Sequence, residues 1–346
     1  MGLKQSLYDW IYRRWRTPAP ALREGYTLLM TVPPDLPVFL RLAVDMCARQ
    51  DLTHLFETIV VPDHQHPRFA GIVDELAKQW PAGKMRLVEI PRFDRILRKL
   101  VRANSLIHWF QLIAGVEETQ TRHALLHDAD LFLLNPRFLR EHYEECVRRD
   151  LCVLGLERPW NKSEWWGQKG FDHLVALWEI EFEAKWMRDM PPAAVRPQPG
   201  KFPHGKWWFE TSLLAQARCA PAKIARRNVE DQYIHFQFII SAYRRFQRAK
   251  REGDVFSDRR FGLLLTRLLI DALDRSGFPY EAPTMGELHA ALREPSPQIT
   301  YAFPEVEVHY ANFRVKLERL LASGLFEPSV VDSMRAGVRP FDDVLA

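Results

Sequence analysis

Long apolar runs and cysteine motifs are both missing from this chain of 346 residues. No stretch of about 18 consecutive apolar residues occurs, so no membrane-spanning helix is predicted, and the N-terminus lacks the apolar core of a signal peptide. The 4 cysteines are scattered without a C-x-x-C pair, which suggests neither a zinc site nor a disulfide framework. These absences predict a protein of a reducing compartment, which we take to be the cytoplasm.

The glycine-rich motifs that bind phosphates are absent as well. G-x-G-x-x-G does not follow the first predicted strand, which argues against a dinucleotide-binding Rossmann domain, and G-x-x-x-x-G-K-[ST] of P-loop NTPases does not occur. No G-x-S-x-G elbow supports a hydrolase triad. A phosphate-binding site in this chain would therefore have no glycine cradle, and a bound cation would have to neutralise the phosphates.

Neither positive nor negative charge is in large excess in this sequence. The net charge of +4 is too small to argue for a nucleic-acid partner, and none is expected. Hydrophobic residues at 47% and charged residues at 27% are ordinary values for a soluble globular protein with a substantial core. The length suits about two average domains, or one large α/β domain with additions.

Residues 1–25 are predicted to form a separate amphipathic and basic helix, which Thr17–Pro20 would end. Apolar residues fall near one face of this helix, and basic residues supply positive charge: Leu3, Leu7, Trp10, Ile11 and Trp15, with Lys4, Arg13, Arg14 and Arg16. Two interpretations remain open. The helix packs on its own domain, or it makes weak peripheral contact with an anionic membrane surface, which would be the inner face of the cell membrane.

From Tyr26 onwards, apolar strands and helices alternate. Strands are expected at residues 26–32, 57–62, 85–90 and up to 127, with helices at 37–49, 69–80 and 94–116 between them. This alternation indicates a parallel sheet covered on both faces. In such sheets ligands bind beyond the carboxyl ends of the strands, where Val32, Asp63 and Asp128 fall.

Two carboxylates stand at the end of the fourth strand, in the stretch HALLHDADLFLLNP from His123 to Pro136. Asp128 and Asp130 are separated by one residue where the chain leaves a buried strand. Two close carboxylates repel each other, and burial makes the repulsion worse. A divalent cation removes the problem, and oxygen ligands spaced Asp-x-Asp suit Mg²⁺ or Mn²⁺.

This order of elements, closed by Asp-x-Asp, resembles the nucleotide-sugar-binding half of glycosyltransferases with the GT-A fold. The resemblance covers about Tyr26 to Arg140, including the apolar continuation Leu131–Pro136. It implies an α/β, Rossmann-like fold with a mainly parallel central sheet, helices on both faces, and helical additions at the N-terminus and in the C-terminal third. It also implies a UDP- or GDP-sugar donor and a Mn²⁺ or Mg²⁺ ion. The residues expected to bind the donor are Thr31, Asp63, Asn104, His108 and Asp128, and those expected to bind the metal are Asp128 and Asp130.

An acidic pair, Glu230 and Asp231, lies in a second patch that runs from Asn228 to His235. The pair is predicted to open a helix and is similar to the family's acceptor-side motif, in which a carboxylate takes the acceptor hydroxyl's proton or orients the sugars. Asp231 is preferred to Glu230 as the catalytic residue. The alternative is that both acids favour the helix dipole in a first turn and have no other role.

A third patch, VEVHYANFR from Val306 to Arg314, is predicted to be an apolar strand. The resemblance implies that His309 returns to the metal as a third ligand and that Arg314 or Lys316 reaches the diphosphate. Asn312 stands where the family has a glycine, and no Lys-Pro-Trp follows, so the choice of basic residue stays open. A single histidine on a strand is also often a structural residue.

The acceptor side is expected within residues 160–209 and just beyond. Trp207 and Trp208 offer flat faces for sugar rings, and Glu210 is placed to meet a sugar hydroxyl, although core packing also explains such tryptophans. We expect one catalytic domain over residues 26–346, with a donor half at 26–140, an acceptor half at 141–346 and a helical insertion at about 240–297. The predicted function is a metal-dependent glycosyltransferase that acts on an unknown carbohydrate or other hydroxyl acceptor. The alternatives are a non-catalytic carbohydrate- or nucleotide-sugar-binding protein of the same fold, or a nucleotidyltransferase.

Overall fold

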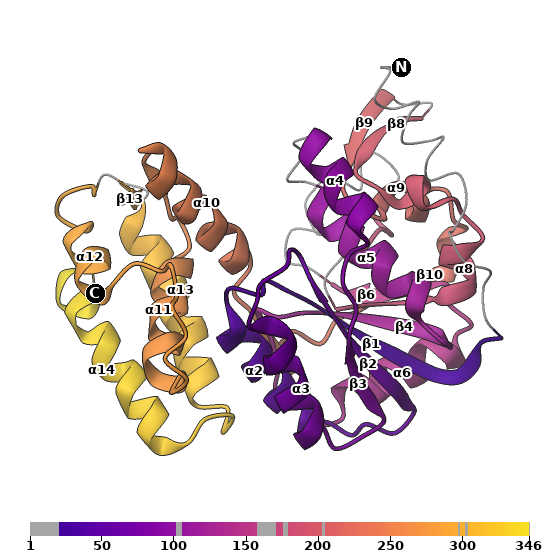
Figure 1. Ribbon diagram of the computed structural model, residues 1–346, viewed down its shortest axis with the longest axis horizontal. Coiled ribbons are helices and arrows are strands. Elements are labelled where there is room, and N and C mark those ends of the chain that lie inside the picture. The colour runs from indigo at the N-terminus through magenta and orange to yellow at the C-terminus, as the bar shows by residue number, and fades with distance from the viewer. Residues whose placement is uncertain are drawn as a thin grey trace. The chain divides into compact units, whose positions relative to one another are not determined.

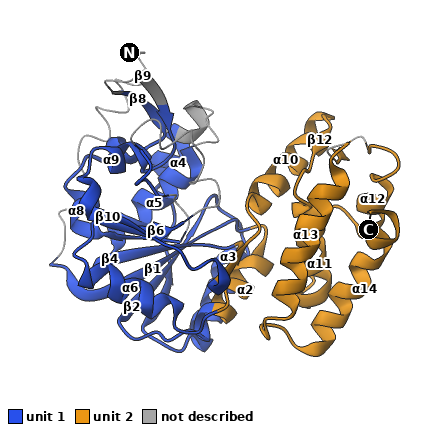
Figure 2. Ribbon diagram, turned by 180° about the vertical axis from the view of Figure 1, so that it is seen from behind, with its two compact units in different colours: residues 1–34, 47–129, 135–232 blue, residues 35–46, 130–134, 233–346 orange. Residues whose placement is uncertain are grey.

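The computed structural model describes residues 21–101, 106–157, 171–175, 179–202, 205–296, 298–301 and 304–345. The chain divides into two compact units, coloured separately in Figure 2. Unit 1 comprises residues 1–34, 47–129 and 135–232, and unit 2 comprises residues 35–46, 130–134 and 233–346. Most of the predicted N-terminal helix, residues 1–20, lies outside the described part of the chain. None of the helices within the described ranges combines the length and the apolar character needed to cross a membrane.

Unit 1 is built on a seven-stranded sheet with the strand order β10-β6-β7-β4-β1-β2-β3 (Figure 1). Its strands are β1 Arg23–Val32, β2 Leu55–Pro62, β3 Lys84–Leu87, β4 Thr121–Asp128, β6 Val153–Leu156, β7 Ile180–Glu183 and β10 Ile224–Arg227. β1 pairs in parallel with β2 and β4, whereas β7 runs antiparallel to β4 and β6. The predicted α/β fold with a mainly parallel sheet is confirmed.

The remaining elements of unit 1 connect these strands. They are α3 Phe69–Gln79, α4 Arg92–Val101, α5 Ile107–Glu118, α6 Phe138–Arg148, α8 Ala184–Arg188, η3 Pro192–Val195, the hairpin β8 Gln198–Phe202 and β9 Gly205–Phe209, α9 Leu213–Ala217, η4 Pro221–Lys223 and η5 Glu230–Gln232. The helix predicted over residues 94–116 is present as two helices, α4 and α5, with residues 102–105 between them outside the described part.

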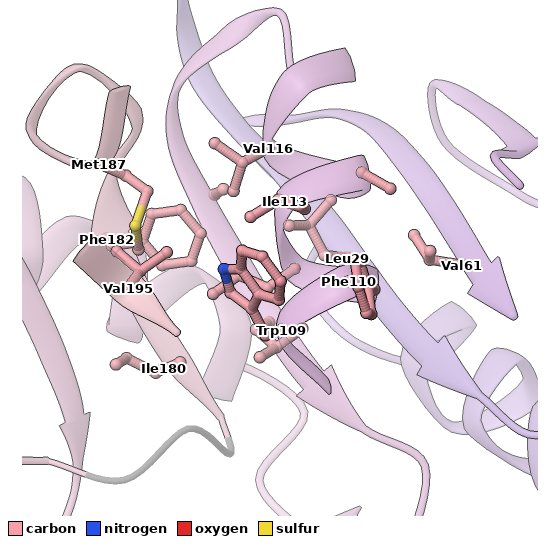
Figure 3. Packing of buried hydrophobic residues seen from close by; sticks show 14 of the residues in the cluster. Leu29, Val61, Trp109, Phe110, Ile113, Val116, Ile180, Phe182, Met187 and Val195 are labelled. Atoms are coloured by element: carbon pink, nitrogen blue, oxygen red, sulfur yellow. The ribbon is translucent and has the colours of Figure 1, made fainter. Parts of the chain in front are cut away.

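The apolar core of unit 1 lies on one face of the sheet, under α5. Because strand side chains alternate between faces, Leu29, Leu126 and Phe182 point to this side and belong to one cluster with Trp109 of α5. Figure 3 shows Leu29 and Phe182 near Trp109. The Trp109 indole N–H donates a hydrogen bond to the carbonyl oxygen of Pro192, at 2.9 Å. Gly115 lets α5 approach closely, since a Cβ atom there would lie 3.2 Å from the Leu29 side chain.

Unit 2 is mainly helical (Figure 2). A two-stranded antiparallel ribbon joins β5 Leu131–Leu133 to β11 Tyr233–His235. The helices are α2 Pro37–Ala48, of which residues up to 46 belong to this unit, α10 Ile239–Glu252, α11 Gly262–Leu273, α12 Met285–Ala290, α13 Val306–Leu321 and α14 Pro328–Leu345, with the short strands β12 Phe256–Ser257 and β13 Ile299–Thr300. Residues 254–297, expected to be helical, contain α11 and α12.

The strand predicted over Val306–Arg314 is wrong, because this segment begins helix α13. The residues that it buries recur at intervals of three and four, which is the spacing of one helix face: Val306, Tyr310, Phe313, Leu317 and Leu320. The alternation of apolar and polar residues at its start matches a strand for only a few residues, and the longer helical pattern prevails.

Candidate metal and donor site

The carboxyl ends of β1, β2 and β4 meet at one edge of the sheet in unit 1. The register places Thr31 opposite Asp128, and the Asp63 N–H donates a hydrogen bond to the carbonyl oxygen of Val32 at 3.1 Å. Thr31 and Asp63 are 4% and 5% exposed. His64 Nδ1 lies 2.5 Å from Asp63 Oδ1. Three of the five residues predicted for donor binding, Thr31, Asp63 and Asp128, therefore lie at this edge, and their role stays a prediction.

The Asp-x-Asp motif begins at this edge. Asp128 is the last residue of β4, and Asp130 stands immediately before β5. Only Ala129 separates the two residues in the chain. Asp130 is buried and Asp128 is half-buried. Two negative charges so close in the chain, partly removed from water, gain stability from a cation between them.

The Asp130 carboxylate has two hydrogen-bonding partners among the described residues, and both belong, like Asp130, to unit 2. His235 Nε2 lies 3.2 Å from Asp130 Oδ1, and the backbone N–H of Ile239, the first residue of α10, donates to Oδ2 at 3.2 Å. The N-terminal end of a helix carries partial positive charge, which favours a carboxylate there. Burial is the largest single effect and raises the pKa of Asp130, but the contacts with His235 and with backbone N–H groups, including that of Ile239, together outweigh it. The pKa therefore lies below its ordinary value, and the side chain is ionised near neutral pH.

His235 is the residue of this site that the sequence did not identify. It pairs with Leu131 through the β5–β11 ribbon, which places its ring beside Asp130. A ligand atom of His235 lies within 4.8 Å of one on Asp130, and both residues belong to unit 2. The sequence signal that could have identified His235 was its position at the end of the patch that contains Glu230 and Asp231.

His309 does not lie in this group. It is on α13, with a side chain that is 31% exposed, and its Nε2 lies 3.7 Å from a carboxylate oxygen of Glu305. The strand that was expected to carry His309 to the metal is absent from this segment, because helical periodicity prevails there. His309 as a third ligand therefore rests on the sequence resemblance alone, and His235 is the histidine that the structure places beside Asp130.

The turn between His235 and α10 is strained. Gln237 and Phe238 have φ angles of 59° and 64°, which non-glycine residues adopt at a cost and keep only where neighbouring contacts require it. Arg260 supplies such contacts, because it donates to Gln237 Oε1 at 2.5 Å and lies 4.3 Å from the centre of the Phe238 ring. We infer that this turn holds the N–H of Ile239 towards Asp130.

One basic side chain lies beside His235. Lys316 Nζ donates a hydrogen bond to the carbonyl oxygen of His235 at 2.9 Å. Burial lowers the pKa of Lys316, and the positive charge of Arg260 lowers it further, while Asp130 acts in the opposite direction. Arg314, the other candidate for the diphosphate, binds Asp342 at 2.8 Å. Of the two basic residues left open by the sequence, Lys316 is the one that the structure places near Asp130.

The acidic pair Glu230–Asp231 forms a single 3₁₀ turn, η5, and both residues are exposed. The predicted helix does not begin there, since the chain continues into strand β11. On the hairpin, Trp208 is 59% exposed, and Glu210 just beyond it is also exposed.

The other predicted site residues are separate or not described. His108 is exposed on α5. Asn104 lies outside the described residues, and the structure does not describe the side chain of Trp207.

No protein-family model and no curated protein matches this chain. Among solved structures, it is similar to the mannosyltransferase PcManGT from Pyrobaculum calidifontis in complex with GDP-Man and Mn²⁺, with a TM-score of 0.42 and 16% identity over 99% of this chain and 95% of that one. It is also similar to S. aureus TarS 1-349, with a TM-score of 0.39 and 10% identity over 92% and 91%. Glucosyl-3-phosphoglycerate synthase from Mycobacterium tuberculosis with Mn²⁺, UDP and glucosyl-3-phosphoglycerate matches with a TM-score of 0.34 and 10% identity over 50% and 60%. At these TM-scores the likeness carries no weight for function, which the residues of the site have to support.

Proposed function

We propose that this protein is a divalent-metal-dependent glycosyltransferase that uses a nucleoside-diphosphate sugar, UDP- or GDP-linked, and a hydroxyl acceptor. The observation that carries the proposal is the environment of Asp130. It is a buried, ionised carboxylate, one residue from a second carboxylate and 3.2 Å from His235 Nε2, directly after the central strand of a mainly parallel sheet. Ligands bind at this end of such strands.

The ligand atoms available at this site favour Mn²⁺ over Mg²⁺. Two carboxylates and an imidazole suit Mn²⁺, whereas Mg²⁺ prefers oxygen ligands alone. Asp128 and Asp130 would hold the ion, with His235 either as a ligand or as the group that orients Asp130. When bound, the cation supplies charge stabilisation to a departing diphosphate. Lys316, beside His235, would add positive charge on the same side.

The acceptor hydroxyl needs a base in order to attack the anomeric carbon. Asp231 is proposed for this role, with Glu230 as the alternative, because both are exposed carboxylates on the turn that leads into the strand of His235. Their exposure leaves them accessible to a substrate, and Asp231 and Glu230 precede His235 by four and five residues in the chain.

A structural role for Asp130 is the competing explanation. Its hydrogen bond from Ile239 N–H is the type of contact that fixes the start of a helix, and this contact needs no metal or nucleotide. A thermal-shift screen separates the two explanations, because a ligand that binds the native state raises its melting temperature. We expect UDP- or GDP-sugars to raise the melting temperature with Mn²⁺ and not with EDTA. No shift with any nucleotide sugar plus Mn²⁺ would favour the structural role.

A further inference from the structure

A histidine, a cysteine and a glutamate are buried together in unit 1, on the face of the sheet opposite the Trp109 core. His123 is on β4, Glu181 is on β7, and Cys146 is on α6, which covers this face. One ligand atom from each lies within 4.8 Å of the other two. The residues are 6%, 0% and 0% exposed in the order His123, Cys146, Glu181. Polar groups of this kind are rarely buried without partners.

Within the cluster, the Glu181 carboxylate and His123 Nδ1 lack hydrogen bonds to any described residue, whereas the Cys146 thiol donates one to the carbonyl oxygen of Leu151 at 3.8 Å. His123 Nδ1 lies 3.0 Å from Glu181 Oε1, which is close enough for an ion pair. A carboxylate with both oxygens buried and unsatisfied is costly, because it has lost water and gained little in return.

A neighbouring pair, with His127 on β4 and Glu179 immediately before β7, forms a satisfied contact. His127 Nδ1 and Glu179 Oε2 form a hydrogen bond of 2.6 Å, and both residues are fully buried. This part of the sheet therefore allows a histidine and a glutamate to pair well. The His123–Glu181 pair does not reach this geometry, and Cys146 lies beside it instead.

The surroundings of the cluster compensate the Glu181 carboxylate only in part, because burial, the largest effect, raises its pKa, while His123, Cys146 and the charge of Arg227 lower it. Cys146 belongs to an apolar cluster with Leu151, Leu154 and Ala225. Burial also raises the pKa of the Cys146 thiol. An ion that binds all three groups would stabilise the carboxylate and the thiolate together.

We propose that His123, Cys146 and Glu181 bind a zinc ion. Imidazole nitrogen, thiolate sulfur and carboxylate oxygen are the three ligand types of protein zinc sites, and the sulfur and nitrogen disfavour Mg²⁺ and Ca²⁺. The two unsatisfied oxygens of Glu181 offer a third and a fourth donor atom. The site is buried and joins β4, β7 and α6, so the ion stabilises unit 1. Its binding releases the thiol proton to solvent.

Metal analysis and cobalt substitution of the full-length protein test this proposal. Protein purified without a metal-affinity step is analysed for zinc, then stripped with a chelator and titrated with Zn²⁺ or Co²⁺. Cys146→Ser and Glu181→Gln each remove one ligand at nearly constant size. Cys219→Ser is the matched control, because Cys219 lies at the edge of the core and outside the cluster.

We expect about one zinc per chain in the wild type and in Cys219→Ser, and at least about tenfold weaker Zn²⁺ binding in the two ligand variants. We also expect a thiolate-to-cobalt charge-transfer band in the wild type that Cys146→Ser lacks. This band separates the cluster from the Asp128–Asp130 site, which has no thiolate. Absence of the thiolate–cobalt band from the wild-type protein would overturn the proposal. This result does not depend on whether any variant folds. Equal zinc affinity in wild type and Cys146→Ser would overturn it as well.

Discussion

His142 makes the stability of unit 1 sensitive to acid. It is fully buried on α6, with Nε2 3.3 Å from the carbonyl oxygen of Leu154 and Nδ1 3.4 Å from Nη1 of Arg227. Because guanidinium only donates, Nδ1 accepts the Arg227 hydrogen bond, and the proton of the neutral ring is on Nε2. A second proton would have to go on Nδ1, facing a cation. Burial, followed by the charge of Arg227, lowers the pKa of His142 to about 3.

The sign and size of the effect follow from this shift. The unfolded histidine has a pKa of about 6.5, so between about pH 6.5 and 3 the unfolded state binds more protons than the folded state. Stability is therefore lost as the pH falls through this window. With a folded pKa of about 3, the change from pH 7 to pH 5 costs ~2 kcal/mol through His142 alone.

The measurement compares wild type with His142→Gln, whose amide does not titrate. Urea unfolding followed by tryptophan fluorescence at pH 7 and pH 5 gives the free energy of unfolding of each protein. We expect wild type to lose ~2 kcal/mol more than His142→Gln between these pH values, whatever the stability of the variant at pH 7. Equal losses in the two proteins would refute the reasoning, because they would show that His142 takes up no proton on unfolding in this range.

Three further predictions concern turnover, nucleotide affinity and packing. Asp231→Asn should lower the rate of sugar transfer about 10²-fold and leave nucleotide binding unchanged. If only Glu230→Gln loses activity, Glu230 is the catalytic residue instead. If both variants stay active, the pair has only a structural role in the turn. Lys316→Met should weaken Mn²⁺-dependent binding of UDP or GDP about tenfold, as measured by calorimetry, because it removes a charge-assisted contact with the diphosphate. An unaltered Kd would show that the diphosphate does not bind beside Lys316. Gly155→Ala should destabilise unit 1 by about 1–3 kcal/mol in urea unfolding, since its Cβ would lie 2.7 Å from Cβ of Val175; wild-type stability would show that this contact relaxes freely.

The parallel half of the sheet was predictable because its signals are local. β1, β2 and β4 each have a short apolar centre, at residues 28–30, 59–61 and 124–126, and parallel pairing then places their carboxyl ends at one edge. The acids after β2 and β4 could therefore be assigned to a common edge from the sequence alone. The register that puts Thr31 opposite Asp128 confirms that placement.

The partner of Asp130 was not predictable in the same way. His235 lies 105 residues further along the chain, and it reaches Asp130 through the antiparallel ribbon of β5 and β11. Each of these strands has three residues, which is too short for a period-two signal. His309 was preferred because its segment resembles the family's C-terminal patch, in which a histidine on an apolar strand returns to the metal, but Val306–Leu321 forms a helix that buries residues at helical spacing.

Calorimetric titration of UDP and GDP, each with Mn²⁺, tests the central claim most directly. The proteins are wild type, Asp128→Asn, Asp130→Asn and the control Asp254→Asn, in which an exposed carboxylate after α10 is replaced. Asparagine keeps an oxygen that can accept the Ile239 hydrogen bond, so melting curves recorded in parallel report the structural role of Asp130 separately.

We expect wild type and Asp254→Asn to bind one of the nucleotides only when Mn²⁺ is present. Asp128→Asn and Asp130→Asn should bind it at least about tenfold more weakly while remaining folded, because each loses a metal ligand. Nucleotide affinity equal to that of wild type in both motif variants, with a lowered melting temperature in Asp130→Asn, would contradict the account and leave the motif a purely structural role.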